Sequence, residues 1–491
     1  MEITDLTPAE ARVRDAFTRG LPAHFDPTAP VAERTVRGEV LRALLVDGPG
    51  EEISGAIPAL DVRHARVSGR FNLKFAEVAH PIRLRECRFE RRVQLYNARL
   101  YSLVLSDSHL PALTAASLRV ESALRLSRCR VEGPVRLTGA RIDGGLFLGG
   151  AVLGAPEDRE RGEEDEAGAR EATLQINHAE IRTDVIACRM TVHGQTRANG
   201  AVIGGLLDLE DSVLEHPDGV ALHAITLTVG SHVRARGLRA RGTVDFAGAR
   251  VPGQLVLTGA ELKTPGRTAL RVSSATVGEL WLRSGPPVEG AVNLRRSTLD
   301  RLHVTPEAWP GTVKLEGLGY GSLLPHLPAA ERLDVLDRDE AGYLPHSYEQ
   351  LAAVYRSVGD EAGAREVQLA RLRRHRGTLP APARLWGLLQ DVTVGYGYRP
   401  ARAALWLPAL LLLGAAAFGA HPPRALKPDE APEFNPIFYT LDLMLPIIGF
   451  GQEGAFAPAG AYQWLSYLLI VLGWVLATTT AAGISRALRR S

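Results

Sequence analysis

The chain has 491 residues, which exceeds one ordinary compact domain unless a repeat extends that domain. Its 57 basic and 55 acidic residues nearly cancel, to a formal charge of +2, so a polybasic nucleic-acid binder is disfavoured and no nucleic-acid partner is expected. The three cysteines, Cys87, Cys129 and Cys188, lie far apart, which excludes a disulfide framework and a C-x-x-C metal or redox pair.

Residues 1–50 are predicted to form an N-terminal helical cap. The stretch from Thr7 to Glu10 is a capping box with proline at the first helical position, and it predicts a helix over 7–19. An amphipathic pattern predicts a second helix over 31–46. Such a cap would cover the open strand edges of a following stack of strands.

An internal repeat of 10 or 11 residues runs through 51–318. Each unit opens with a small residue and continues with apolar residues at alternate positions, which predicts short strands with one face inward. Two units, about 22 residues, would close one coil, so we expect a mainly β fold, a β-solenoid of roughly ten coils. The first nine units open at Ala65, Ala76, Cys87, Ala98, Ser108, Leu118, Cys129, Ala140 and Ala151.

The repeat accounts for two of the three cysteines. Cys87 and Cys129 occupy the same position of the unit as Ala65 and Ala140. We therefore expect both to be buried as small apolar residues rather than to act as reactive thiols.

Charge is distributed unevenly along the repeat domain. The segment 155–173 carries eight acidic and three basic residues, a net charge of −5, and is predicted to be a solvated acidic insertion. Over 62–153 the balance reverses, with 16 basic and 7 acidic residues. A basic face could bind anionic lipid or a polyanion; ordinary outward-facing strand positions would give the same composition.

Residues 319–400 are predicted to form a helical hairpin followed by a juxtamembrane connector. Helical patterns cover 348–358 and 361–374, and a Gly-Asp turn separates them. A single hairpin of this kind cannot bury its apolar face alone.

The last part, 401–491, contains two uncharged apolar segments, 403–420 and 464–484, each predicted to be a transmembrane helix. The first is at the short end of the range, so a buried core helix remains the alternative there. Arginines crowd before the first segment and after the second, which places both termini in the cytoplasm and makes the chain a two-pass protein of the cell (inner) membrane. The residues expected to lie at the membrane interface as juxtamembrane anchors are Tyr396, Tyr398, Arg399, Arg402, Trp406 and Trp464.

The segment 435–453 between the two apolar segments is itself apolar but too short to cross a membrane. It is predicted to be either an amphipathic segment on the outer surface or a re-entrant pore loop. The chain has the order of segments found in two-helix potassium-type channels: a helix, an apolar half-helix, Gly-Phe-Gly and a second helix. It differs from them at Ile447, which stands where their filter has threonine. Asp442 at membrane depth would be costly, which makes it a functional candidate. The residues of this candidate pore segment are Asp442, Ile447, Ile448, Gly449, Phe450 and Gly451.

The common catalytic signatures are missing from the sequence. It has no Gly-Lys dipeptide of a P-loop, no His-Glu-x-x-His and no Gly-x-Ser-x-Gly. Residues 449–454 match G-x-G-x-x-G, but no strand precedes them and no βαβ unit surrounds them. We therefore assign no catalytic residue, no cofactor and no metal ligand.

The repeat units, such as Ala-Arg-Ile-Asp-Gly-Gly-Leu at 140–146, resemble degenerate pentapeptide repeats, and this resemblance implies a right-handed β-helix. The order of motifs along the whole chain is similar to a group of uncharacterised actinobacterial membrane proteins that end in a two-helix membrane hairpin. Members of that group are often labelled membrane-associated oxidoreductases. The motifs that carry the second resemblance are Glu39-Val-Leu-Arg42, Trp309-Pro310, Tyr348-Glu-Gln-Leu-Ala352 and Thr393-Val-Gly-Tyr-Gly-Tyr-Arg-Pro400.

These patterns favour a membrane-anchored cytoplasmic β-helical protein that binds or scaffolds a protein partner and has no catalytic activity. One alternative is an oligomeric ion channel, a homo-oligomer with a pore loop at 435–453 that the β-helix gates. A second alternative is the membrane-associated oxidoreductase that the resemblance suggests, which would need a bound redox cofactor.

Overall fold

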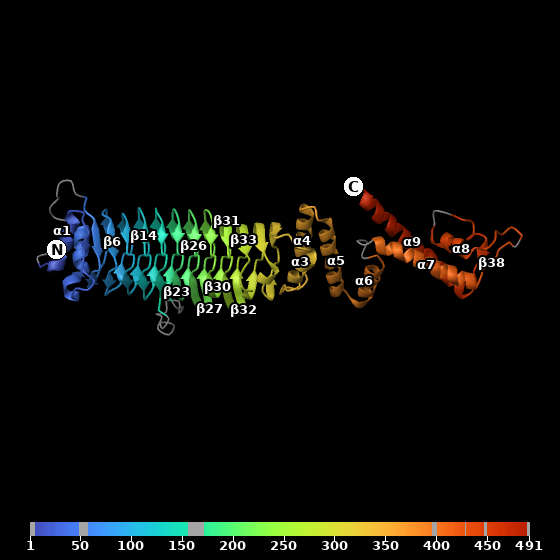
Figure 1. Cartoon of the computed structure of the whole chain (residues 1–491), viewed down its shortest axis with the longest axis horizontal. Helices are drawn as coiled ribbons and strands as arrows, with labels where there is room; N and C mark the ends of the chain where they lie inside the picture. Colours follow the sequence, from blue (N-terminus) through green and yellow to red (C-terminus); the bar gives the residue numbers. More distant parts are fainter. Residues whose placement is uncertain are drawn as a thin grey trace. The chain divides into compact units, whose positions relative to one another are not determined.

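The computed structural model describes residues 5–48, 57–155, 171–394, 400–427, 429–445 and 449–488, with the backbone alone at 386, 389–390, 392–394, 400–404 and 478–488. The chain forms two compact units, Met1–Gln350 and Leu351–Ser491. The first unit is built around a parallel β-solenoid of about 11 turns, and the second is mainly helical (Figure 1).

One coil of the solenoid consists of four two-residue strands, β10 (Leu103–Val104), β11 (His109–Leu110), β12 (Leu113–Thr114) and β13 (Arg119–Val120). The chain then returns to β14 (Leu124–Arg125), which pairs in parallel with β10. Within the described residues, strands stacked in this way form one sheet of 20 strands and one of 17. The step from Leu103 to Leu124 is 21 residues and the next step, to Leu146, is 22 residues, which confirms the predicted coil length.

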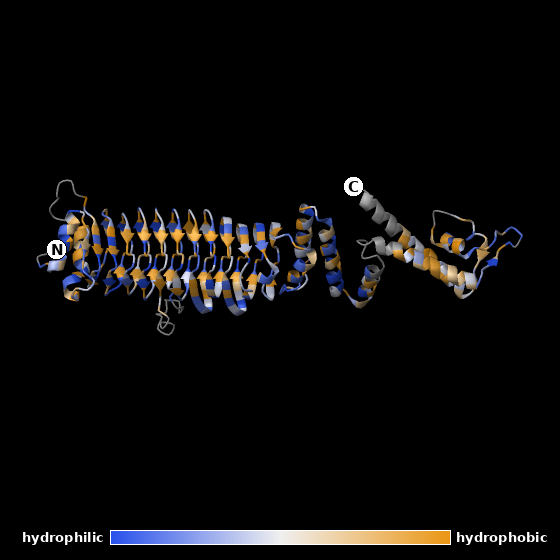
Figure 2. Cartoon of the chain, in the orientation of Figure 1, coloured by the Kyte–Doolittle hydropathy of each residue, from blue (hydrophilic) through white to orange (hydrophobic). Residues whose placement is uncertain are grey.

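The core of the solenoid is a set of apolar ladders along its axis. Leu103, Leu124 and Leu146 follow one another in register and are fully buried. Figure 2 shows hydrophobic residues repeating along the strands of both sheets. Burial of each such leucine contributes about 2 kcal/mol of hydrophobic stabilisation, so the period read from the sequence is imposed by this core.

The corners of the coil have a left-handed backbone. At each described corner the residue immediately before the first residue of the repeat unit has a positive φ, which glycine adopts most readily. Seven corner residues are glycine, for example Gly139, and fourteen are other residues with φ between 52° and 61°. These fourteen are His64, Phe75, Glu86, Asn97, Asp107, Ser117, Arg128, His178, Arg189, Asp211, Thr226, Ser274, Ser284 and Arg296.

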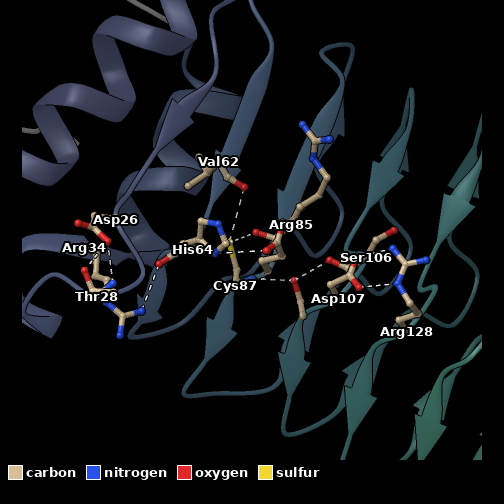
Figure 3. A network of polar contacts seen from close by, with 12 residues as sticks. Asp26, Thr28, Arg34, Val62, His64, Arg85, Cys87, Ser106, Asp107 and Arg128 are labelled. Atoms are coloured by element: carbon tan, nitrogen blue, oxygen red, sulfur yellow. Dashed lines mark hydrogen bonds and ion pairs between the residues drawn. The ribbon is translucent and has the colours of Figure 1, made fainter.

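The residue after the corner is buried, as the repeat predicts, at every one of these positions except Gly285. Cys87 and Cys129 are 2% and 1% exposed, and burial raises the pKa of each thiol to about 12. The thiol of Cys87 points toward the carbonyl oxygen of Val62 in the preceding coil (Figure 3). Buried and protonated, these two thiols are poor nucleophiles.

Apart from the coil with the acidic insertion, two coils are longer than the usual 21 or 22 residues: the step from Leu207 to Val233 is 26 residues and the step from Leu255 to Leu280 is 25. Strands β27 (Val213–His223), β30 (Arg239–Asp245) and β32 (Glu261–Arg271) pair with one another through register shifts that accommodate the extra residues. Arg267 donates to the carbonyl oxygens of Asp218 and Pro217 at 2.9 and 3.1 Å and ties the two extensions together. Most of the predicted acidic insertion, 156–170, lies outside the described residues.

The N-terminal end of the solenoid carries helix α1 (Pro8–Thr18) and helix α2 (Gly38–Val46). The capping box of α1 forms as predicted, with the side chain of Thr7 accepting from the amide of Glu10. The helix predicted over 31–46 is wrong in its first half. That half is a 3-10 turn, η1 (Val31–Arg34), followed by strand β2 (Thr35–Arg37), because β2 pairs with β4 (Arg66–Ser68) and starts the second sheet.

An ion pair with a buried carboxylate holds this cap together. The carboxylate of Glu10, which is fully buried, lies 2.7 Å from the guanidinium of Arg37. Burial by itself would raise the pKa of Glu10, but hydrogen bonds from Arg37 and from the amide of Thr7 outweigh it and lower the pKa to about 2.

At the other end of the solenoid, polar side chains of the following segment form hydrogen bonds with the backbone of the last coils. The final strand, β37 (Gly319–Leu324), is followed by helix α3 (Ala329–Leu336) and helix α4 (Pro345–Ser357). Asp339 accepts from the amide of Leu315 at 2.8 Å, and Arg332 donates to the carbonyl of Val304 at 2.8 Å. These buried side chains satisfy backbone groups that would otherwise form an open edge.

The second unit begins within helix α4, at Leu351, and continues with helix α5 (Glu361–Thr378) and helix α6 (Ala381–Val394), so part of the predicted connector is helical. Asp391 on α6 lies 3.0 Å from Arg373 and 3.2 Å from Arg376, both on α5. Burial alone would raise the pKa of Asp391, but the hydrogen bonds and charges of the two arginines lower it.

Candidate functional site

The last part of the chain is a short helix packed between two long ones. Helix α8 (Pro436–Met444) contacts both α7 (Pro400–Ala420) and α9 (Ala461–Leu488), which also contact each other. A two-stranded antiparallel pair, β38 (Arg424–Ala425) and β39 (Phe456–Ala457), joins the connections on either side of α8. The buried side chains of the cluster are Phe418, Tyr439, Leu443, Met444, Phe456 and Leu469.

Two glycines allow the long helices to approach α8 closely. A Cβ at Gly414 on α7 would lie 2.3 Å from Thr440, and one at Gly473 on α9 would lie 2.5 Å from the carbonyl oxygen of Met444. Neither distance is compatible with a side chain at the glycine. Each of the two predicted apolar segments therefore packs against α8 through a glycine.

Asp442 on α8 organises the loop that follows this helix. Asp442 is 6% exposed, and its carboxylate accepts hydrogen bonds from the backbone amides of Phe450, Gln452 and Glu453. The donor–acceptor distances are 2.5, 2.7 and 3.0 Å. Three charge-assisted bonds compensate the burial of this carboxylate and fix the loop against the last turn of α8.

A second set of hydrogen bonds ties the loop to the start of α8. The buried side chain of Gln452 accepts from the amide of Asn435 at 3.1 Å and donates to the carbonyl of Glu433 at 3.0 Å. Asn435 in turn caps α8 by accepting from the amides of Ile437 and Phe438. Neither Gln452 nor Asn435 is among the predicted site residues, although Asn-Pro at the start of an apolar run is a recognisable N-cap signal.

Of the predicted pore segment, the structure brings only part together. Gly449, Phe450 and Gly451 lie on the exposed side of the loop and Asp442 lies behind them. Ile447 and Ile448 lie outside the described residues.

The predicted juxtamembrane anchors are described in part. Trp406 on α7 is 41% exposed and Trp464 on α9 is 76% exposed. Arg402 belongs to α7, where only the backbone is described, and Tyr396, Tyr398 and Arg399 lie outside the described residues.

Four polar and aromatic side chains form a cluster on the outer face of the solenoid. On β33 (Thr276–Leu282), Glu279 accepts from the indole of Trp281 at 2.8 Å, and Arg301 donates to it at 2.8 Å. These donors hold the pKa of Glu279 low, and burial lowers the pKa of His303, whose ring stacks on Trp281 at 4.0 Å. An ionised carboxylate with several donors is a weak base, so this cluster suits recognition better than proton transfer.

The basic half of the solenoid presents a ladder of arginines. Arg99, Arg119 and Arg141 lie side by side in successive coils of one sheet. Acidic residues pair with the outer two, Glu77 with Arg99 at 3.8 Å and Glu180 with Arg141 at 3.3 Å. Like charges at adjacent ladder positions repel, so the ladder attracts acidic groups.

Two further observations concern the described part of the chain. It contains no cluster of three or more histidine, cysteine, aspartate or glutamate side chains suited to a metal ion. Within the same ranges, no helix combines the length and the hydropathy needed to cross a membrane. Comparisons of the chain with protein-family models, curated proteins and solved structures found no match.

Proposed function

We propose that the β-solenoid is a binding or scaffolding module for a protein partner and that the C-terminal helices hold it at the inner membrane, with both termini in the cytoplasm. The solenoid carries the first half of this proposal. Its stacked coils present long, regular outer faces with fixed spacing, the type of surface that repeat proteins use for binding.

The membrane half of the proposal is supported by apolar side chains that the folded unit leaves uncovered. Leu405 and Leu412 on α7 are 71% and 72% exposed, and Trp464 and Val471 on α9 are 76% and 60% exposed. Figure 2 shows the hydrophobic colouring of the described part of both helices. An exposed apolar surface of this kind marks contact with lipid or with another protein.

The proposal includes kinship with the actinobacterial membrane proteins named above and rests there on the quoted motifs. It assigns no chemical step to the chain. No observation on the described residues favours the oxidoreductase that the label of that group suggests.

Reporter fusions and crosslinking test the two halves separately. A fusion after Arg374 should report a cytoplasmic location; an extracytoplasmic signal would overturn the orientation. A photo-crosslinking residue in place of Arg119 should capture a partner protein in cells, and the same residue in place of Arg384 on α6 is the control. Capture of the same proteins from position 384 would contradict the scaffold.

A second candidate function is an oligomeric ion channel, favoured by one observation. A short helix packs between two long apolar helices and ends in a loop whose backbone is fixed from behind by Asp442. A pore needs several copies of the chain, so this candidate requires a homo-oligomer. Crosslinking of the detergent-solubilised full chain should trap assemblies of three or more copies, and a strict monomer would exclude the pore.

A further inference from the structure

The hydrogen bonds to Asp442 fix the direction of the loop's carbonyl groups as well as its amides. A trans peptide unit is planar, so its N–H and the C=O of the preceding residue point in opposite directions. The amides of Phe450 and Gln452 point at Asp442. The carbonyl oxygens of Gly449 and Gly451 must therefore point away from it.

These two carbonyl oxygens are open. No hydrogen bond reaches either of them within the described residues, whereas the next carbonyl, that of Gln452, accepts from the amide of Ala455 at 3.3 Å. Among the described residues, a Cβ built at Gly449 or Gly451 would meet no atom within 4 Å. Gly451 has φ +79°, a conformation that a residue with a side chain would adopt only with strain.

The surroundings of the loop favour a cation. Asp442 lies in the last turn of α8, the end of a helix that carries partial negative charge. Glu453 follows the loop directly. The chain has no lysine or arginine between Lys427 and Arg486, so no basic side chain of this segment opposes a bound cation.

We propose that the carbonyl oxygens of Gly449 and Gly451 coordinate a dehydrated monovalent cation, in a site that further copies of this chain complete. This inference rests on the channel candidate above. Two oxygens per chain are too few, because a hard cation takes about six to eight, so three or four copies are needed. Neutral carbonyls suit a monovalent ion; a divalent ion prefers carboxylates, and Asp442 already accepts three amides.

Contacts between the copies have a surface available beside the loop. Ile437, Phe438 and Phe450 are 50%, 44% and 43% exposed, and the rings of Phe438 and Phe450 lie 5.3 Å apart. Asp442 is a positioning residue in this site, since it faces the amides and not the ion.

The test uses the full chain reconstituted in vesicles of neutral and anionic lipid, with potassium, sodium and chloride fluxes measured separately. The unchanged chain should pass a monovalent cation and exclude chloride. Asp442→Asn replaces one acceptor oxygen by a donor group, so cation flux should fall at least about tenfold. Glu430→Gln, an exposed acid-to-amide change that touches neither α8 nor the loop, is the matched control and should leave the flux unchanged.

A second readout does not depend on flux. Potassium, compared with choline, should raise the melting temperature of the detergent-solubilised oligomer, and Asp442→Asn should abolish that increase while the crosslinked oligomer persists. Vesicle-bound oligomer with no cation flux and no effect of potassium on melting would overturn the site, as would equal passage of chloride or full activity of Asp442→Asn. Flotation separates the two proposals: chain that does not float with the vesicles overturns membrane anchoring, and the melting measurement then decides the cation site alone.

Discussion

The hydroxyl of Ser108 donates to the carbonyl oxygen of Leu84 at 2.9 Å and accepts from the amide of Cys87 at 3.0 Å, so one buried side chain links two coils. Ser212 repeats this arrangement with Ala187 and Met190 in a later coil. A serine hydroxyl at the first position of the repeat unit therefore forms hydrogen bonds with a backbone amide and a carbonyl at the corner, which the strand pairing does not satisfy.

Ser108→Ala should lower the free energy of unfolding by about 1–2 kcal/mol, because the two backbone groups lose their partner in a buried place. Urea unfolding followed by circular dichroism measures the change. Ser106→Ala, which removes a half-buried hydroxyl two residues away, is the matched control; equal effects of the two variants would contradict this role of Ser108.

The cysteines should differ in reactivity toward iodoacetamide. Cys87 and Cys129 are buried with a pKa of about 12, whereas Cys188 is half-buried. Mass spectrometry of the native chain at pH 8 should therefore show modification of Cys188 first, and of all three only after unfolding. Early modification of Cys129 would show that its corner opens in the native state.

Exchanging residues between equivalent corners should move stability in opposite directions. Thr226 and Gly248 are corner residues one coil apart, with φ of 54° and 66°. Thr226→Gly should stabilise the solenoid by about 1 kcal/mol, since a β-branched residue is strained there, and Gly248→Thr should destabilise it by at least as much. Thermal unfolding of both variants gives the sign, and a loss of stability in Thr226→Gly would contradict the strain.

The free energy of unfolding should fall in acid because Glu10 becomes protonated. Its pKa is lowered from 4.5 to about 2 in the folded chain, so its contribution is complete above pH 4.5 and is lost as the pH falls toward 2. The shift corresponds to about 3 kcal/mol. Glu10→Gln should therefore cost stability at pH 7 and much less near pH 2 in urea unfolding, whereas Glu33→Gln, at an exposed site, should cost little at either pH.

Replacing the central arginine of the ladder should relieve repulsion. Arg119→Glu places a carboxylate between Arg99 and Arg141, so we expect a gain of about 0.5–1 kcal/mol. The gain should shrink in about 1 M salt, where charges are screened within about 3 Å. Arg119→Gln, which only removes a charge, should gain less, and a gain that is independent of salt would exclude an electrostatic origin.

The coil could be predicted from the sequence because burial imposes it. Leu103 and Leu124 must face the axis one coil apart, and a ladder that slipped by one residue would expose both. The left-handed corners could not be predicted, since residues such as Phe75 and Arg128 rarely adopt this conformation. They do so here because the hydrogen-bonded ladders on either side outweigh the local strain.

The candidate site was predicted only in part. Asp442 was selected because a carboxylate in an apolar segment is costly, and the structure shows the amides that compensate it. Those amides belong to residues eight to eleven positions away in a loop without a regular pattern, so spacing alone could not identify them. The close contacts of Gly414 and Gly473 with α8 could not be predicted either, since they depend on where α8 packs.

Because the coils stack, the solenoid can be shortened or lengthened only by whole coils. Each coil contacts its neighbours alone, and the corner residues sit at fixed positions within it, so removal of one complete turn, for example 103–123, would leave the remaining ladders in register. Each such deletion or duplication would move the two ends of the solenoid by about 4.8 Å, the spacing of adjacent strands. Chains that differ by whole coils would therefore have solenoids whose lengths differ in discrete steps.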